Sequence, residues 1–238
     1  MGRDAHATFY PRLIGVPYSW AGMPMLQWNA FMPDPQNDSH PVNFGVTRRY
    51  GANLPHWTKT GGIYFVTFRL ADSVPVSVQR QWIAEREACL AAANSQDGRL
   101  SAEDQQRLFT EKVDRLLDSG TGACWMRQSA VAKIVAGALA HFDNQRYRMH
   151  AWCVMPNHVH VVVEPLADNE LPTILHSWKS YSAQQINQVI GQAGKLWQEE
   201  YYDHMIRDHD DLGHCVNYTI QNPGRAGLKD WPWLARLP

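Results

Sequence analysis

The sequence of 238 residues has few cysteines, no long apolar run and almost no net charge, and each of these absences excludes a class of protein. Its four cysteines are scattered without a C-x-x-C pair, and the first residues lack the basic and then apolar profile of a secretory signal. We therefore expect a reduced, cytoplasmic compartment. No apolar stretch approaches the ~18 residues needed to cross a bilayer. The net charge of −1 argues against a protein that covers long stretches of duplex DNA through its phosphates.

Apolar and aromatic residues are plentiful instead. Apolar residues make up 45% of the chain and charged residues only 19%, with ten tryptophans, which is far from the composition of disordered chains. The length is sufficient for one sizeable domain, or two small ones, with a packed core. Charge is locally uneven, because residues 40–70 contain four basic side chains and no acidic one, and residues 121–150 contain four basic side chains against Asp143 alone.

The hydrophobic pattern predicts an α+β domain with an antiparallel sheet and helices on one face. Alternation over residues 61–70 predicts the first strand, and a turn at MPNH predicts that two later strands pair as a hairpin. The expected strands are 61–70, 147–155 and 158–165, and the expected helices are 78–97, 101–118, 129–142, 172–189 and 209–222. We expect residues 1–54 to be a poorly defined extension and 55–238 to be one domain, with a helical insertion at about 75–120.

Two histidines in the second hairpin strand form an H-x-H motif. His158 and His160 are two residues apart, so both imidazoles leave the same face of the strand, about 6.6 Å apart along its axis. This spacing suits two ligands of one divalent metal. The opposite face carries valines that pack on a core, so we expect one solvated, catalytic face and one dry face. The alternative is that the histidines only form hydrogen bonds within a half-buried sheet.

Other metal-binding folds also use H-x-H, and the neighbouring residues discriminate between them. Metallo-hydrolases of the H-x-H-x-D type require an aspartate at position 162, where this chain has Val162. Cupin barrels place a glutamate four residues after the second histidine, and Glu164 matches that position. The chain is nevertheless too helical for a jelly roll and lacks the glycines and second histidine motif of that fold.

The last predicted helix supplies a tyrosine and an amide. Tyr218 and Asn222 are four residues apart, and hence on one face of the helix. An amide oxygen is a reasonable third ligand for a hard cation such as Mg²⁺ or Mn²⁺, and Tyr218 would then lie beside the metal. Most of the nine tyrosines are expected to serve packing, but only Tyr218 is followed by a ligand-type residue one turn later and an N-P dipeptide.

Four ordered blocks of sequence resemble a known family. MPNHVHVVVEP, LHSWKSYSAQQIN, LWQEEYYDHMIRD and YTIQNPGRAGL, with PHWTKTGGIYFVTFRLAD upstream, are similar to the REP-associated tyrosine transposases, a branch of the single-tyrosine HUH transposases. The resemblance extends from Pro55 to the C-terminus and implies a ferredoxin-like or RRM-like HUH domain. It implies that His158, His160 and Asn222 bind the metal and that Tyr218 is the nucleophile. The extension before Pro55 and the helical insertion depart from the compact family form.

The resemblance also implies a reaction and a partner. Relatives cleave and join single-stranded DNA at hairpins of repetitive extragenic palindromes through a 5′-phosphotyrosine, with Mg²⁺ or Mn²⁺, and we expect this chain to do the same as a monomer or homodimer. His214, one turn before Tyr218, is a candidate base. Two alternatives remain, namely a non-catalytic single-stranded or hairpin DNA-binding protein and a cupin-like enzyme for small molecules. The candidate DNA-binding residues are Arg48, Arg49, Lys59, Arg69, Lys179 and Arg207.

Overall fold

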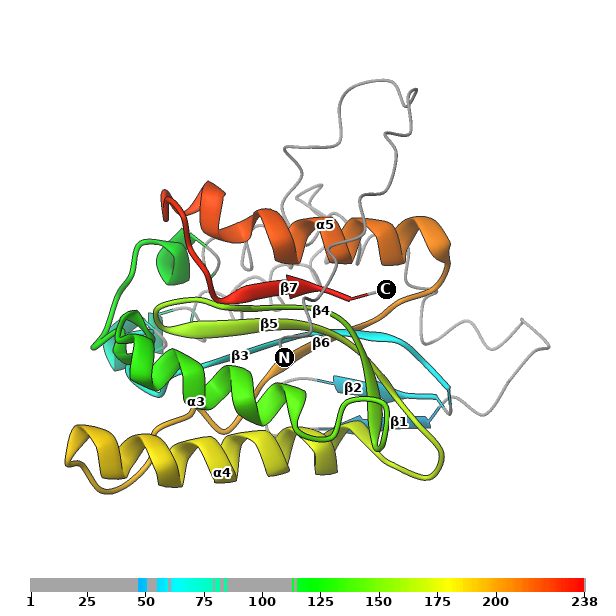
Figure 1. Ribbon diagram of the computed structural model, residues 1–238, viewed down its shortest axis with the longest axis horizontal. Helices are drawn as coiled ribbons and strands as arrows, with labels where there is room; N and C mark the ends of the chain where they lie inside the picture. Colours follow the sequence, from blue (N-terminus) through cyan, green and yellow to red (C-terminus); the bar gives the residue numbers. More distant parts are fainter. Residues whose placement is uncertain are drawn as a thin grey trace, which may run out of the picture.

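A five-stranded antiparallel sheet forms the centre of the molecule (Figure 1). The computed structural model describes residues 47–50, 55–59, 61–78, 80–81, 84, 113 and 115–237, with side chains from residue 59 onward. The strand order is β6-β3-β5-β4-β7, and each neighbouring pair is antiparallel. The strands are β3 (Tyr64–Arg69), β4 (Tyr147–Val154), β5 (His158–Pro165), β6 (Tyr202–Met205) and β7 (Leu234–Arg236).

The predicted hairpin is confirmed and lies near the middle of the sheet. β4 pairs with β5 in antiparallel register, with an irregularity between Met149 and Ala151. On its other edge β5 pairs with β3, which places Thr67 opposite His160 and Arg69 opposite His158. Since β5 is flanked by strands on both sides, its two faces can be reached only from above and below the sheet.

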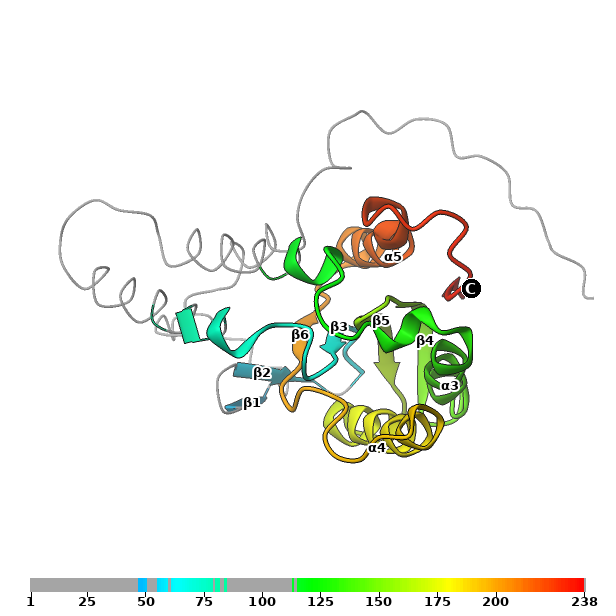
Figure 2. The same ribbon diagram turned by 90° about the vertical axis from the view of Figure 1, so that its left-hand side faces the viewer.

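Helices cover both faces of this sheet. Figure 2 shows α3 (Ser129–Ala140) and α4 (Leu171–Ile190) on one side and α5 (His209–Arg225) on the other. The α+β class and the antiparallel sheet are confirmed, and the expectation of helices on one face holds for α3 and α4. α5 does not follow this expectation, because it covers the opposite face of the sheet. That face of β5 bears His158, His160 and Val162, and a second apolar cluster joins Val162 to α5.

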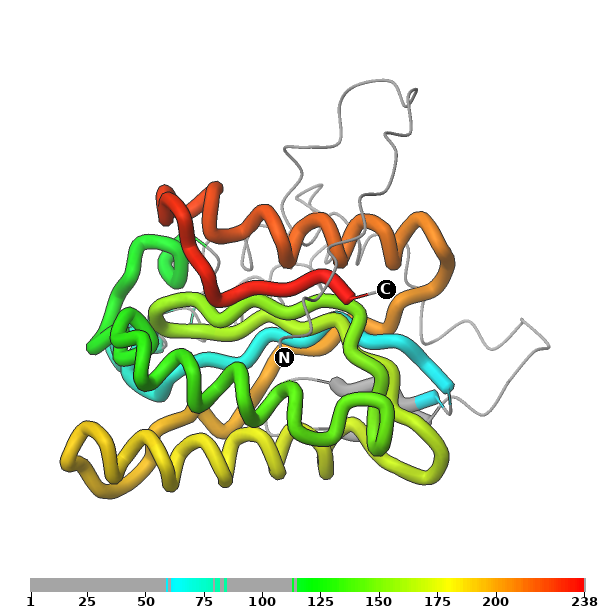
Figure 3. Tube along the Cα trace, viewed as in Figure 1, coloured from blue at the N-terminus to red at the C-terminus, as the bar shows by residue number. Residues whose placement is uncertain are grey.

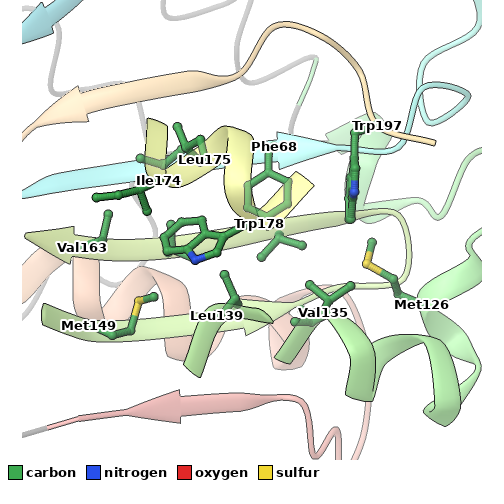
Figure 4. Packing of buried hydrophobic residues seen from close by; sticks show 14 of the residues in the cluster. Phe68, Met126, Val135, Leu139, Met149, Val163, Ile174, Leu175, Trp178 and Trp197 are labelled. Carbon is green, nitrogen blue, oxygen red and sulfur yellow. The ribbon is translucent and has the colours of Figure 1, made fainter. Parts of the chain in front are cut away.

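The main core fills the space between the sheet and the helices α3 and α4. The alternation of β5 directs Val159, Val161 and Val163 to this side. Helix α3 contributes Val135 and Leu139, whose spacing of four residues places them on one helix face. Figure 4 shows this layer, to which the following residues also belong: Phe68, Met126, Met149, Ile174, Leu175, Trp178 and Trp197.

Several boundaries differ from the sequence-based expectation. α5 continues to Arg225, past the predicted end at Asn222, because the peptide groups after Pro223 still form a last turn in which Ala226 N–H donates to Asn222 O at 3.0 Å. The strands β6 and β7 were not predicted, since strands of four and three residues are too short to show alternation. The 3-10 helix η2 (Trp125–Arg127) precedes α3.

The first described residues form a second, two-stranded sheet. β1 (Thr47–Tyr50) pairs antiparallel with β2 (Pro55–Thr58), so regular backbone begins within the predicted extension 1–54. Most of that extension, and most of the two predicted helices of the insertion, lie outside the described residues. The domain boundaries therefore stay a prediction. Within the described part of the chain, no helix is both long and apolar enough to cross a membrane.

Candidate active site

His158 and His160 lie side by side on β5 with their ring nitrogens converging. The two Nε2 atoms are 3.0 Å apart, and the rings meet at 79°. Each side chain is only 1% exposed, so the face expected to be solvated is in fact covered. The reason is α5, which packs its own apolar residues against the same face of the sheet.

Neighbouring side chains fix the orientation of each imidazole. His158 Nδ1 lies 2.7 Å from Asn157 Oδ1, and the Asn157 amide is itself oriented because its Nδ2 donates to Thr121 O at 2.9 Å. His160 Nδ1 lies 2.8 Å from the hydroxyl of Thr67, on the adjacent strand. Hydrogen bonds of this kind to the outer nitrogen of a histidine typically orient the inner nitrogen of a metal ligand.

Burial keeps both histidines neutral, which is the form that binds metal. Desolvation lowers the pKa of His158 to about 3. The pKa of His160 lies well below its usual value because of burial first, and then because of His158 and Arg225. Neutral imidazoles have a free lone pair on one ring nitrogen, so no proton must be removed at neutral pH before a cation binds.

α5 brings the predicted tyrosine and amide to the same place. The ring of Tyr218 lies 5.4 Å from the ring of His160 and 5.7 Å from that of Phe65, edge-on to both. Tyr218 and Asn222 are buried, at 6% and 1% exposure, because they share the face of the helix that packs on the sheet. Tyr218 and Asn222 share one helix face, as their spacing predicts, and the structure brings the ring of Tyr218 beside His160 of the H-x-H motif.

The residues present fit a divalent cation. Asn222 Oδ1 is fully buried and has no hydrogen-bond partner among the described residues. An unpaired buried carbonyl oxygen costs about 1–3 kcal/mol, which a cation at this position would offset. Two imidazole nitrogens and one amide oxygen form a mixed nitrogen and oxygen set of the kind that suits Mn²⁺, while Mg²⁺ prefers oxygen ligands.

Two charged residues near this site were missed by sequence reasoning. The guanidinium carbon of Arg225 lies 5.2 Å from the ring centre of Tyr218. Asp118 Oδ1 lies 4.0 Å from His158 Nε2. Arg225 could have been found from its spacing, since it is seven residues after Tyr218 and hence on the same face of the helix. Asp118 belongs to a segment 40 residues before His158, and no local pattern relates the two.

The other predicted site residues are more scattered. His214 is half-buried one turn before Tyr218; burial lowers its pKa, while Asp211 acts in the opposite direction. Arg69 lies opposite His158 in the sheet, donates to Ser73 Oγ at 3.2 Å, and has a pKa lowered by burial. Lys59 and Arg207 are both exposed. Arg48 and Arg49 lie in β1, where only the backbone is described.

Lys179 lies away from the histidines. It belongs to α4, on the opposite face of the sheet, and its Nζ donates to Glu199 O at 2.7 Å across a groove lined by Leu175, Trp197 and Tyr201. Desolvation, together with the neighbouring charge of Lys195, lowers the pKa of Lys179 to about 8. The sheet therefore separates Lys179 from Tyr218, and this candidate is not part of the same site.

A second cluster with metal-binding side chains lies at the start of α5. His204, Asp211 and Cys215 place one possible ligand atom each within 4.8 Å of the others. His204 Nε2 lies 3.0 Å from Asp211 Oδ2. Burial raises the pKa of Asp211, but the hydrogen bonds and charges of His204 and Arg207 together outweigh burial, so the pKa is lowered. Burial strongly raises the pKa of the Cys215 thiol, which disfavours the thiolate that a metal requires. We interpret this cluster as a link between α5 and β6.

Comparison with known proteins gives a consistent assignment. Residues 128–222 match the family model described as "Transposase IS200 like", a span that contains both histidines, Tyr218 and Asn222. An Escherichia coli K12 REP-associated tyrosine transposase is 28% identical over 92 residues, which cover 37% of this chain and 53% of that protein. Over this segment the chain is similar to the REP-associated tyrosine transposases. A Haemophilus influenzae protein that carries this name provisionally is also 28% identical, over 97 residues covering 35% of this chain and 55% of that one.

The extent of this relationship is limited. The chain spans about half the length of the curated transposases that it matches. A solved structure of a REP-associated tyrosine transposase bound to a REP hairpin covers 77% of this chain and 82% of its own, with 19% identity and a TM-score of 0.44. The resemblance inferred from the sequence blocks is confirmed by the family-model match and the two curated transposases, for the segment of residues 128–222.

Proposed function

We propose that this chain is a metal-dependent transposase of the single-tyrosine type, which cleaves and rejoins single-stranded DNA at hairpins of the REP kind. The observation that carries the proposal is the position of Tyr218, whose ring lies 5.4 Å from the ring of His160. Tyr218 shares a helix face with Asn222, whose Oδ1 has no hydrogen-bond partner among the described residues. A hydroxyl nucleophile beside two converging neutral imidazoles that can hold a divalent cation suits phosphoryl transfer to a tyrosine.

His158, His160 and Asn222 are the proposed metal ligands. Mg²⁺ or Mn²⁺ bound there supplies a positive charge that stabilises the negative charge developing on the scissile phosphate. The protein contributes the fixed ligand orientation, through Asn157 and Thr67, and a site from which water is largely excluded by α5.

Tyr218 is the proposed nucleophile. Its phenolic oxygen forms a bond to phosphorus while the bond from phosphorus to the 3′-oxygen breaks. The departing 3′-oxygen takes a proton from water, which leaves a 5′-phosphotyrosyl link and a free 3′-OH. His214, half-buried one turn away and with its pKa lowered by burial, is the proposed acceptor of the phenolic proton. Because the covalent link conserves the phosphodiester, a second 3′-OH can reverse the step and join new ends.

The proposed partner is a DNA hairpin with a single-stranded foot. A tyrosine on a helix reaches a backbone phosphate more readily in a splayed single strand than in a stacked duplex. The similar transposases are described as REP-associated, and the solved complex contains a REP hairpin, which supports this choice of DNA. The near-neutral charge of the chain fits a small footprint on the DNA rather than wide coverage of a duplex.

A denaturing gel with labelled single-stranded hairpin DNA from repeats next to the encoding gene tests the proposal. The wild-type chain with Mn²⁺ is expected to give a protease-sensitive, covalently shifted band that is absent with EDTA and absent in Tyr218→Phe. Tyr181→Phe is the matched control, because Tyr181 is 54% exposed on α4, on the other side of the sheet. Its adduct is expected at the wild-type level.

Two results would contradict the proposal. Binding of the hairpin without any adduct in the presence of Mn²⁺ would favour the non-catalytic DNA-binding alternative. An adduct that persists in Tyr218→Phe would assign the nucleophile to another residue. Loss of the adduct in His160→Ala, with hairpin binding retained, would support the metal site separately from DNA recognition.

A further inference from the structure

A continuous row of hydrogen bonds links the two histidines to their neighbours. Asn157 lies at the centre of its first part, with Nδ2 2.9 Å from Thr121 O and Oδ1 2.7 Å from His158 Nδ1. The two histidine Nε2 atoms, 3.0 Å apart, continue the row, which ends at the Thr67 hydroxyl, 2.8 Å from His160 Nδ1. Figure 3 shows β3, the strand of Thr67, running beside the hairpin that carries both histidines. All four side chains of the row are buried, so water does not compete for these bonds.

The end of the row at Asn157 has a fixed direction. The carbonyl oxygen of Thr121 can only accept, so the amide nitrogen of Asn157 faces it and the amide oxygen faces His158. The loop that carries this carbonyl is anchored, because Ala123 N–H donates to Asp72 Oδ2 at 2.7 Å. Asn157 therefore presents an acceptor to His158 and cannot present a donor without losing its bond to the loop.

This direction determines which nitrogen of each histidine carries a proton. Both rings are buried and neutral, and a neutral imidazole has one N–H. His158 donates from Nδ1 to Asn157, which leaves a lone pair on its Nε2. The hydrogen bond between the two Nε2 atoms then places the proton of His160 on Nε2. His160 Nδ1 is consequently an acceptor, and the Thr67 hydroxyl donates to it.

A cation bound by both Nε2 atoms requires a change at His160 alone. His158 already has its lone pair on Nε2, whereas His160 must carry its proton on Nδ1 instead. The His160 ring releases one proton from Nε2 to water and takes one from water at Nδ1, so its charge is unchanged. His160 Nδ1 then donates to Thr67 Oγ1, and the hydroxyl rotates its own hydrogen away. A hydroxyl can act in both arrangements, because it offers one donor and two lone pairs.

We propose that Thr67 is a positioning residue that allows His160 to change from the tautomer that pairs with His158 to the tautomer that binds the metal. The inference rests on the proposed function, because it concerns the same two metal ligands. A bound cation polarises the imidazole and makes its Nδ1–H a stronger donor, so the bond to Thr67 contributes more in the metal-bound state. Loss of the hydroxyl should therefore weaken metal binding.

Nitrogen NMR of the full chain with ¹⁵N-labelled histidine, in EDTA at neutral pH, tests the metal-free arrangement. The ring nitrogen shifts distinguish the two neutral tautomers, and His158→Gln and His160→Gln assign the signals. We expect the proton on Nδ1 in His158 and on Nε2 in His160. A proton on Nδ1 of His160 in the metal-free chain would overturn the inference, because no change of tautomer would then be needed.

Calorimetric titration of the full chain with Mn²⁺, without DNA, tests the role of the hydroxyl. Thr67→Val keeps the shape of the side chain and is expected to raise the Kd for Mn²⁺ about tenfold. Thr67→Ser keeps the hydroxyl, and its Kd is expected within about threefold of wild type. Thr219→Val is the matched control, since Thr219 is also buried but donates to Cys215 O at 2.8 Å, and its Kd is expected within about twofold of wild type. Circular dichroism establishes that each variant is folded.

The outcomes separate the inference from the proposed function. Wild-type affinity in Thr67→Val, with binding lost in His160→Ala, would overturn the role of Thr67 and leave the proposed metal site intact. Equal losses in Thr67→Val and Thr219→Val would assign the effect to packing and overturn the inference as well. Wild-type affinity in His160→Ala would overturn the metal site itself. A loss in Thr67→Val that Thr67→Ser avoids, with the His160 proton on Nε2 in the metal-free chain, supports the inference.

Discussion

The two faces of the central sheet have the same backbone but different chemistry. β5 contributes Val159, Val161 and Val163 to one face and His158 and His160 to the other. The first face packs against two helices and forms the larger core. Among the described residues, the second face packs mainly against α5, with a smaller apolar cluster and a group of buried polar atoms.

This difference separates stability from chemistry. Burial of apolar side chains under α3 and α4 stabilises the sheet, so the opposite face can keep buried polar groups that cost free energy. Of those groups, Asn222 Oδ1 has no hydrogen-bond partner among the described residues. Mutations on the first face should therefore affect mainly folding, whereas those on the second should affect mainly metal and DNA.

Truncation of Trp178 gives the largest expected effect. Trp178 is 2% exposed, packs edge-on against Tyr147 with ring centres 5.0 Å apart, and donates from Nε1 to the Tyr147 hydroxyl at 2.9 Å. Trp178→Ala should lower the free energy of unfolding by about 3–5 kcal/mol, because it leaves a cavity and removes one hydrogen bond to the Tyr147 hydroxyl. Urea unfolding measures this change.

The control for this comparison lies on the same helix. Tyr181→Ala, at a position 54% exposed, should change the free energy of unfolding by less than about 0.5 kcal/mol. Equal decreases in the free energy of unfolding for Trp178→Ala and Tyr181→Ala would mean that the core under α4 is not the main source of stability.

Without metal, acid should lower the free energy of unfolding, because the face of the sheet under α5 contains buried neutral histidines. The pKa of His158 is about 3 in the folded chain because of burial, and it is close to 6.5 when unfolded, so between these values the unfolded chain binds a proton that the folded chain does not. The free energy of unfolding should then fall as the pH decreases below about 6.5, by at most about 1.4 kcal/mol per pH unit for each histidine. Asp118, whose pKa burial raises to about 6, gives a smaller effect of opposite sign.

Urea unfolding with EDTA between pH 7.5 and 5 measures this slope. His158→Gln should make the slope shallower than in wild type. His176→Gln is the control, since His176 is exposed on α4 and its replacement should leave the slope unchanged. A wild-type slope in His158→Gln would show that protonation of other groups causes the acid sensitivity.

The sequence predicted the apolar face better than the polar one. Alternation and helical periodicity located β3, β5, α3 and α4 because burial on one side leaves a regular pattern. H-x-H and Y-x-x-x-N-P identified the residues that α5 and β5 bring together. Asp118 carries no such pattern, because its closeness to His158 depends on the path of the insertion and of the loop after it. Arg225 has the spacing that places it on the helix face of Tyr218, but it lies beyond the predicted end of the helix at Asn222 and was therefore missed. Coverage of the histidines by α5 was also not predicted, since a hydrophobic pattern does not assign a helix to one face of a sheet.

Arg225 gives the smallest expected effect and the sharpest test of the polar face. Its guanidinium lies over the Tyr218 ring at the exposed end of α5, and a nearby cation favours the deprotonated form of a phenol, which is the attacking species. Arg225→Gln should slow formation of the covalent DNA adduct by about three- to tenfold, while the Kd for Mn²⁺ stays within about twofold and Arg225→Lys retains most of the rate. Lys229→Gln removes an equal charge from an exposed position four residues later and should leave the rate unchanged. If both glutamine variants slow adduct formation equally, Arg225 acts through general attraction of DNA. If only Arg225→Gln slows it, the position of the guanidinium over the Tyr218 ring causes the effect.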